Sequence, residues 1–190
     1  MVVVMAEVAT VEKRPFTRAD LARLPDDGRR YEIIDGDLYV SGAPSARHQR
    51  AVGRLCRLLD DACPEGFEVV VGPFEVGLAN DTEMRPDLLV ARREDLTDKE
   101  ITRPPALVVE VLSPSTRSAD LNAKRWRLER AGTPSYWAVD PGTRPEQARL
   151  IVWELAGDGR YRQVADVTGD AAWQVSRPYP VVVVPAALAR

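Results

Sequence analysis

The sequence predicts an α/β protein with a mixed central β-sheet that is flanked by helices and carries additional β-hairpins. The elements alternate in type along the chain, as a helix, a hairpin, a helix, several strands, a helix and further strands. The stretch 107–112 is apolar almost throughout, as expected of a buried central strand. Turn sequences at Asp35-Gly36 and at 157–159 separate strand-like halves, which predicts two hairpins.

Three helices are expected, over residues 17–24, 46–62 and 118–131. Thr17 can cap the first helix, with Asp20 at the capping-box position. The second helix is indicated by an apolar stripe at helical spacing, formed by Val52, Leu55, Leu58 and Leu59. The third begins at Ser118 or Ala119, and Gly132 suits the position just after its end.

Strands are expected over residues 31–34, 38–40, 67–71, 74–78, 85–91, 106–112, 135–140, 148–155 and 161–167. Glu110 interrupts the most apolar of these runs. A lone carboxylate inside a hydrophobic strand is costly unless it is paired or bound to a metal. Glu110 is therefore the first candidate for a functional side chain.

The chain of 190 residues fits a single domain over residues 16–190, preceded by a flexible segment over residues 1–15. Cys56 and Cys63 are expected on one helix, too far apart for a disulfide. A structural zinc site is disfavoured because His48 is the single histidine. The apolar N-terminal stretch is too short to span a membrane and lacks the features of a signal peptide, so a cytoplasmic location without membrane association is expected.

The composition, with 45% hydrophobic and 29% charged residues, suits a folded globular protein rather than a disordered one. The formal net charge is −3, so the chain lacks the overall basic character of many nucleic-acid-binding proteins. A nuclease, however, needs only a local basic surface and concentrates acids at its metal site. Arginine dominates among the 26 basic residues, which suits planar contacts to phosphate and to carboxylate.

Acidic residues beside apolar strands indicate a metal site. Asp87 precedes one strand-like run, Glu110 lies in the next, and Glu32 lies in the early hairpin. If the strands of Asp87 and Glu110 are neighbours, their carboxylates can converge on a hard divalent cation. Such a cation lowers the pKa of a bound water and neutralises charge on a phosphate. A nearby lysine stabilises further charge or helps to position and deprotonate the water, and Lys124 is the candidate for this role.

Several segments in order resemble the Uma-two family of the PD-(D/E)xK restriction-endonuclease-like superfamily. They are Tyr31-Glu32-Ile33-Ile34-Asp35-Gly36, Arg85-Pro86-Asp87-Leu88, the stretch 108–116 (VVEVLSPST), Asp120-Leu121-Asn122-Ala123-Lys124, the stretch 131–137 (AGTPSYW) and Val139-Asp140-Pro141. The resemblance covers residues from about 17 to about 185. It implies a restriction-endonuclease-like fold and a metal-dependent endonuclease that hydrolyses phosphodiester bonds, with DNA as the expected substrate.

The resemblance also implies roles for individual residues. Asp87, Glu110 and the backbone carbonyl of Val111 would be metal ligands for Mg²⁺, or for Mn²⁺ in its place. Lys124 would be the catalytic lysine and Glu32 an auxiliary acid. The superfamily lysine normally stands two residues after the second acid, where this chain has Leu112. The lysine is therefore expected to have moved to the following helix, and the family resemblance also suggests a homodimer.

Each of these roles has a structural alternative. Glu110 could be a buried acid paired with an arginine, and Asp87 a turn residue at the start of a strand. Lys124 could pair with Asp120 on a solvated helix face. Glu32 could be a surface strand residue.

Two further residues are possible auxiliaries. His48 could serve as a base or a phosphate contact, or could be an exposed helix residue. Ser113 could bond to the site or cap a turn. Tyr136 and Trp137 are expected in the core rather than as stacking platforms for bases.

Two other function classes remain open at this stage. The fold could bind nucleic acid or regulate without turnover, or it could be a structural oligomer. In the oligomer, the apolar stretch 181–184 would be buried against a partner.

Overall fold

The computed structural model describes residues 14–190, so the predicted flexible segment falls almost entirely outside the described residues. The helices are α1 (Arg18–Leu21), α2 (Ala46–Asp60), α3 (Arg117–Ala119), α4 (Arg125–Ala131) and α5 (Pro185–Ala189). The strands are β1 (Arg30–Ile34), β2 (Asp37–Ser41), β3 (Phe67–Val71), β4 (Glu75–Ala79), β5 (Thr82–Met84), β6 (Leu88–Arg92), β7 (Glu100–Ile101), β8 (Leu107–Val111), β9 (Ser135–Asp140), β10 (Arg149–Leu155), β11 (Tyr161–Thr168), β12 (Trp173–Val175) and β13 (Val181–Val183).

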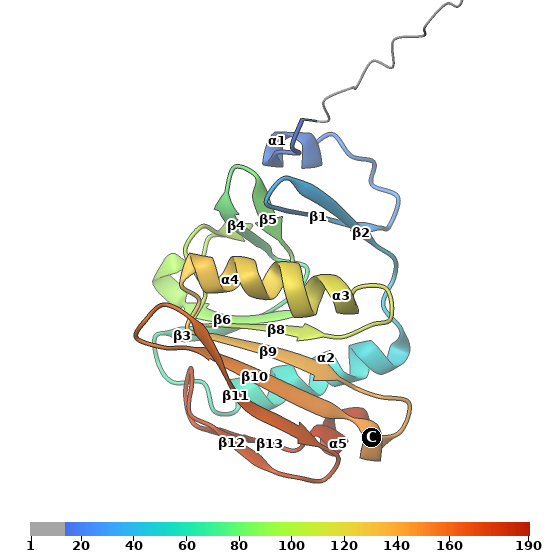
Figure 1. The fold of residues 1–190 in the computed structure, drawn as a ribbon, viewed down its shortest axis with the longest axis vertical. Helices are drawn as coiled ribbons and strands as arrows, with labels where there is room; N and C mark the ends of the chain where they lie inside the picture. Colours follow the sequence, from blue (N-terminus) through green and yellow to red (C-terminus); the bar gives the residue numbers. More distant parts are fainter. Residues whose placement is uncertain (1–13) are drawn as a thin grey trace, which may run out of the picture.

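The centre of the molecule is a mixed six-stranded sheet with the order β11-β10-β9-β8-β6-β3 (Figure 1). Its two central strands, β8 and β9, are parallel, and every other pair in it is antiparallel. Helix α2 covers one face, and the helical segment from α3 to α4 covers the other (Figure 1). The predicted mixed α/β architecture is therefore confirmed.

Side chains of β8 alternate between the two faces of this sheet. Leu107, Val109 and Val111 pack in the same cluster as the apolar side of α2. Val108 and Leu112 pack in the cluster that contains Leu128 of α4. Since residues two apart in a strand share a face, Glu110 lies on the α4 side.

A second sheet, with the order β2-β1-β5-β4-β7, carries the N-terminal hairpin. Asp35 and Gly36 form the turn between β1 and β2 with φ values of 50° and 84°. Positive φ at both central residues is the requirement of a tight hairpin turn, so the predicted Asp-Gly turn is confirmed. The hairpin brings Glu32 toward the end of the six-stranded sheet.

Most predicted elements are present, but the structure differs from the prediction in several places. Strands β5, β7, β12 and β13 and helix α5 were not predicted, and the expected strand over residues 85–91 begins only at Leu88. Helix α2 ends at Asp60, so Cys63 lies beyond it rather than on the same helix as Cys56; both are free thiols. The third helix is interrupted by a π-helical turn, Asp120–Lys124, between α3 and α4.

The C-terminal apolar stretch mainly completes the chain's own core. It forms β13, which pairs with β12, and Val181 and Val183 are buried in the core cluster of α2, while Val182 is 52% exposed. The expectation that residues 181–184 bury against another chain is therefore wrong for Val181 and Val183. Between residues 14 and 190, no helix has both the length and the apolar character needed to cross a bilayer.

Candidate active site

Neighbouring strands bring Asp87 and Glu110 together. Strand β6 pairs with β8 in a register that sets Leu88 opposite Val109, so one further step sets Asp87 opposite Glu110. Directly opposite residues of an antiparallel pair project from the same face. The backbone N–H of Val111 donates to Asp87 Oδ2 at 2.8 Å, which ties the two strands together at this point.

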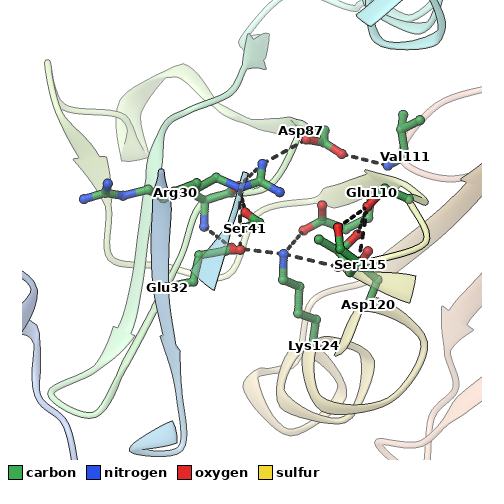
Figure 2. Close-up of polar contacts among 12 residues, drawn as sticks. Arg30, Glu32, Ser41, Asp87, Glu110, Val111, Ser115, Asp120 and Lys124 are labelled. Atoms are coloured by element: carbon green, nitrogen blue, oxygen red, sulfur yellow. Dashed lines mark hydrogen bonds and ion pairs between the residues drawn. The ribbon is translucent and has the colours of Figure 1, made fainter. Parts of the chain in front are cut away.

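Lys124 reaches the acids from the π-helical turn. Its Nζ lies 2.8 Å from Glu110 Oε1, 3.0 Å from Glu32 Oε1 and 3.3 Å from Asp120 Oδ1 (Figure 2). The lysine is only 1% exposed. Asp120 and Lys124 begin and end the turn, which directs both side chains inward. An ammonium group has three N–H donors, and here three carboxylates surround it.

Glu32 is held from β1 by two further contacts. The backbone N–H of Arg85 donates to Glu32 Oε1 at 2.7 Å, and Arg30 Nε lies 3.7 Å from Oε2. Arg30 extends from the same strand on the same side, two residues earlier. The N-terminal hairpin therefore contributes both an acid and a cation to the site.

Asp87 has three partners in all. Arg30 NH1 donates to Oδ1 at 3.0 Å, and His48 Nε2 lies 3.0 Å from Oδ2, which also accepts the Val111 N–H. Although the carboxyl is buried, the hydrogen bond from His48 and the charges of His48 and Arg30 lower its pKa to about 2. A carboxylate offers about four acceptor positions, so Asp87 retains room for one more ligand.

The pKa of Glu110 shifts in the opposite direction. Burial raises its pKa well above the usual value, and the negative charges of Asp120, Asp87 and Glu32 raise it further, against the opposing effect of Lys124. Burial also raises the pKa of Asp120. Although burial opposes it, the three surrounding carboxylates raise the pKa of Lys124, so the ammonium stays charged at neutral pH. The cluster thus holds more negative charge than its own cations balance.

The donor set suits a hard divalent cation. Four buried carboxylates face two permanent cations, Lys124 and Arg30, which leaves two formal negative charges when His48 is neutral. Glu110 Oε2 is buried and has no hydrogen-bond partner among the described residues. Within residues 14–190, no three His, Cys, Asp or Glu side chains are arranged to enclose a metal by themselves. Mg²⁺ does not need such a cage, because it is usually held by one or two carboxylates together with water and substrate phosphate.

A cavity of about 620 Å³ opens beside this cluster. Arg30, His48 and Asp87 line it together with the loop Ser113, Pro114, Ser115 and Thr116 and the first turn of α2. Its volume falls in the usual range for a site that binds a small ligand or a part of a larger one. Of the four acids in the cluster, only Asp87 is among the lining residues, so a ligand in the cavity would meet the cluster at Asp87.

The structure also decides between several of the alternatives. Lys124 does pair with Asp120, but in a buried cluster rather than on a solvated face, and Glu110 pairs with that lysine rather than with an arginine. Glu32 is 2% exposed, so it is not a surface residue. His48 is buried against Asp87, and the expectation of an exposed helix residue is wrong.

Ser113 forms hydrogen bonds within its own loop. Its hydroxyl bonds to those of Ser115 and Thr116 and accepts the backbone N–H of Thr116, so it caps the turn and also lines the cavity. Tyr136 and Trp137 are fully buried, as predicted. The Tyr136 hydroxyl donates to the carbonyl of Asp120 at 2.8 Å and so supports the π-helical turn.

The sequence did not reveal Arg30 or the inward role of Asp120. Arg30 lies next to other charged residues at 26–30 and resembles a surface position. The one available signal was its spacing of two from Glu32 on the same strand. For Asp120 the signal was the i, i+4 spacing to Lys124, which was interpreted as a surface pair.

A mixed sheet covered by helices on both faces, with buried acids and a lysine at one end of its central strands, is the architecture of a restriction-endonuclease-like protein. The chain belongs to the Uma2 family, described as "Putative restriction endonuclease", whose model matches residues 18–187. The resemblance identified from the motifs is therefore confirmed.

A solved structure supports the same fold. The crystal structure of a protein from Anabaena variabilis ATCC 29413, titled a putative nuclease belonging to DUF820, superposes with a TM-score of 0.70. The match covers 92% of this chain and 98% of that one at 17% sequence identity, so it bears on the fold alone. No curated protein matches the chain.

Proposed function

We propose that the protein is a metal-dependent endonuclease that hydrolyses phosphodiester bonds in DNA. The observation that carries this proposal is the buried Lys124 ammonium, held between Glu32, Glu110 and Asp120 next to the strand of Asp87. Asp87 and Glu110 would hold Mg²⁺, or Mn²⁺ in its place, with the Val111 carbonyl as a further ligand. When bound, such an ion supplies an activated water and neutralises charge on the phosphate.

Lys124 acts in this proposal through its charge. Because the surrounding carboxylates raise its pKa, the ammonium keeps its proton at neutral pH and is a poor base. Of the two roles expected for the lysine, stabilisation of the negative charge that develops on the phosphate is thus favoured over deprotonation of water. Glu32 and Asp120 keep the ammonium in place.

The two metal-binding acids differ in their protonation. Asp87 stays ionised over the physiological range because Arg30 and His48 stabilise its negative charge. Glu110 has a raised pKa and one oxygen without a partner. Occupation by a cation would compensate the negative charges that raise the pKa of Glu110, so metal binding is expected to tighten as the pH rises.

The test is cleavage of supercoiled plasmid DNA by the full chain with Mg²⁺ or Mn²⁺. Glu110→Gln and Lys124→Met should each abolish nicking, whereas Arg162→Gln, an exposed change on β11, should leave it intact. Isothermal titration with Mn²⁺ should detect binding to the unaltered protein and its loss in Glu110→Gln. An absence of cleavage of both DNA and RNA with either metal would refute the proposal.

One observation favours a second candidate function, a nucleic-acid-binding or regulatory module without turnover. Much of the cluster is internally paired, since Lys124 Nζ lies within 3.3 Å of three carboxylates and Asp87 has three partners. In that case DNA binding would survive Glu110→Gln and no nicking would be detected with the unaltered protein. A homodimer is a separate expectation, which sedimentation of the full chain would test.

A further inference from the structure

The cavity beside the acid cluster is lined by cationic groups as well as by Asp87. Among the described residues, three arginines line it, Arg29, Arg30 and Arg85. Arg29 and Arg85 are paired with carboxylates that do not line the cavity. Arg30 differs from them, because its nearer carboxylate partner, Asp87, is itself part of the cavity wall. Arg30 is therefore the arginine that a ligand beside Asp87 would meet.

The guanidinium of Arg30 has one nitrogen without a partner. NH1 donates to Asp87 Oδ1 at 3.0 Å and to the backbone carbonyl of Arg85 at 3.2 Å. Nε donates to the hydroxyl of Ser41 at 3.3 Å (Figure 2). NH2 has no hydrogen-bond partner among the described residues, and the side chain is 23% exposed. Because the planar guanidinium presents its donors in a fixed fork, Arg30 can hold Asp87 with one nitrogen and a phosphate oxygen with another.

Helix α2 begins at the same cavity. Ser45 is its N-cap, where the hydroxyl accepts the backbone N–H of His48 and the carbonyl accepts that of Gln49. The backbone N–H groups of Ala46 and Arg47 have no partner among the described residues, and the first turn contains no acid. Free N–H groups and the helix dipole leave partial positive charge at a helix N-terminus, which favours an anion there. Since Ser45, His48 and Gln49 line the cavity, a ligand in it would lie beside this charge.

His48 gives an independent indication of a ligand. Its side chain is 9% exposed, and its Nε2 lies 3.0 Å from Asp87 Oδ2. Its Nδ1 is buried and has no hydrogen-bond partner among the described residues. A buried nitrogen without a partner costs stability, and native structures rarely leave one without water or a ligand. Because His48 lines the cavity, a polar ligand there would supply a partner that the protein lacks.

We infer that the cavity contains a phosphate-binding subsite, formed by Arg30 and by the first turn of α2 at Ser45 and His48, which holds a phosphate of the substrate beside Asp87. The inference rests on the proposed nuclease function and names the residues that bind its substrate. A phosphate oxygen accepts several N–H donors at once, whereas a cationic or apolar ligand would leave these donors unpaired. The contacts are with phosphate and imply no sequence preference.

Ser45 permits a test that keeps the helix cap in place. Aspartate and asparagine are about as good as serine at an N-cap, so Ser45→Asp and Ser45→Asn should both retain the hydrogen bond to His48 and differ by one charge. The aspartate would place a negative charge at the cavity wall. Gln174→Glu, at an exposed position of β12 that does not line the cavity, adds the same charge elsewhere. Arg30 is less suitable, because its removal would also release Asp87.

Binding is measured with the full chain in EDTA at constant ionic strength, by titrating inorganic phosphate and following the backbone amide resonances of Ala46 and Arg47 by NMR. These resonances should shift and saturate in the unaltered protein and in Gln174→Glu. Ser45→Asp should bind phosphate about tenfold more weakly than Ser45→Asn, because a like charge close to the ligand repels it. Equal affinities in the two Ser45 variants, or no shift of the two resonances, would overturn the inference.

Fluorescence anisotropy of a short labelled DNA strand, under the same conditions, distinguishes the substrate from free phosphate. The inference predicts that DNA also binds more weakly to Ser45→Asp than to Ser45→Asn, with Gln174→Glu equal to the unaltered protein. If inorganic phosphate follows this order and DNA does not, the subsite serves a free phosphate compound and the inference is overturned.

Plasmid nicking separates this inference from the proposed function. If the unaltered protein nicks DNA, KM for the plasmid should be higher in Ser45→Asp than in Ser45→Asn. An equal KM in the two variants would overturn the subsite and leave the nuclease function standing. If phosphate and DNA follow the predicted order of affinities but nothing is nicked with Mg²⁺ or Mn²⁺, the subsite stands and the nuclease function is wrong.

Discussion

The buried ammonium of Lys124 leads to a quantitative prediction for stability. Lys124→Met keeps the shape of the side chain but leaves Glu32, Glu110 and Asp120 without their shared cation, at contacts of 2.8–3.3 Å and with 1–2% exposure. Removing one partner of a buried ion pair costs about 3–5 kcal/mol. We therefore expect Lys124→Met to lower the free energy of unfolding by about 3–5 kcal/mol at pH 7, measured by urea denaturation.

Two controls distinguish buried charge from a general packing defect. Breaking the exposed Arg57–Asp61 pair with Arg57→Gln should cost less than about 1 kcal/mol. Adding Glu110→Gln to Lys124→Met removes one of the uncompensated charges, so the double variant should be more stable than Lys124→Met alone. A packing defect would leave the double variant equally unstable or less stable.

The stability defect of Lys124→Met should also depend on pH. Burial already raises the pKa of Glu110 in the folded state, and loss of Lys124 would raise it further. When the pKa of an acid is higher in the folded state than in the unfolded state, the protein loses stability as the pH rises above the unfolded-state pKa. It regains that stability as the pH falls back toward the unfolded-state pKa. The Lys124→Met defect should therefore shrink between pH 7 and pH 5. A defect below about 1 kcal/mol at pH 7, or one unchanged at pH 5, would refute the reasoning.

Three further outcomes are expected. Tyr179→Phe removes a buried hydrogen bond of 2.7 Å to the carbonyl of Leu59 and should lower the free energy of unfolding by about 1 kcal/mol in urea denaturation; no change would contradict it. Gly72→Ala would bring a Cβ within 2.2 Å of the Pro86 carbonyl and should cost about 1–3 kcal/mol in the same assay, against Gly53→Ala as a control expected to be neutral or stabilising. Because the pKa of Asp87 falls from 3.8 to about 2 on folding, the ionised carboxylate adds about 2 kcal/mol to the free energy of unfolding above pH 4. That contribution is lost as the pH falls through 2, so the difference in stability between the unaltered protein and Asp87→Asn should shrink over that range. A constant difference would refute the prediction.

The extent to which the site was predictable differs from residue to residue. Glu110 was evident from the sequence because a carboxylate in an apolar strand violates the local pattern. Whether the strands beside Asp87 and Glu110 are neighbours stayed a condition in the sequence analysis, and the register of β6 with β8 fulfils it. Lys124 was a candidate because it lies on the helix that follows Glu110, and the family resemblance implied its catalytic role, but nothing local distinguishes a buried lysine from a surface one in a charged helix. The catalytic and metal-binding roles themselves stay predictions.

Other parts could not be predicted for physical reasons. Strand β5 is three residues long and is defined by its partners β1 and β4 rather than by its own pattern. The hairpin of β12 and β13 is held by packing against the same core cluster as α2. Because the sequence does not show this packing, the valines of β13 resembled an apolar patch that a partner would cover. Arg30 acquires its role only when the N-terminal hairpin meets β6, a contact across more than fifty residues of sequence that no local signal encodes.

The π-helical turn at Asp120–Lys124 bears on how this chain could be engineered or could diverge. Such turns amount to one residue inserted into an α-helix, and they are found mostly where function holds them in place. Deleting one residue within it would restore regular winding and rotate everything on one side by about 100° relative to the other. The shortened helix should be more regular yet swing Lys124 away from Glu32 and Glu110, so changes that improve thermal tolerance here would disrupt the buried cluster.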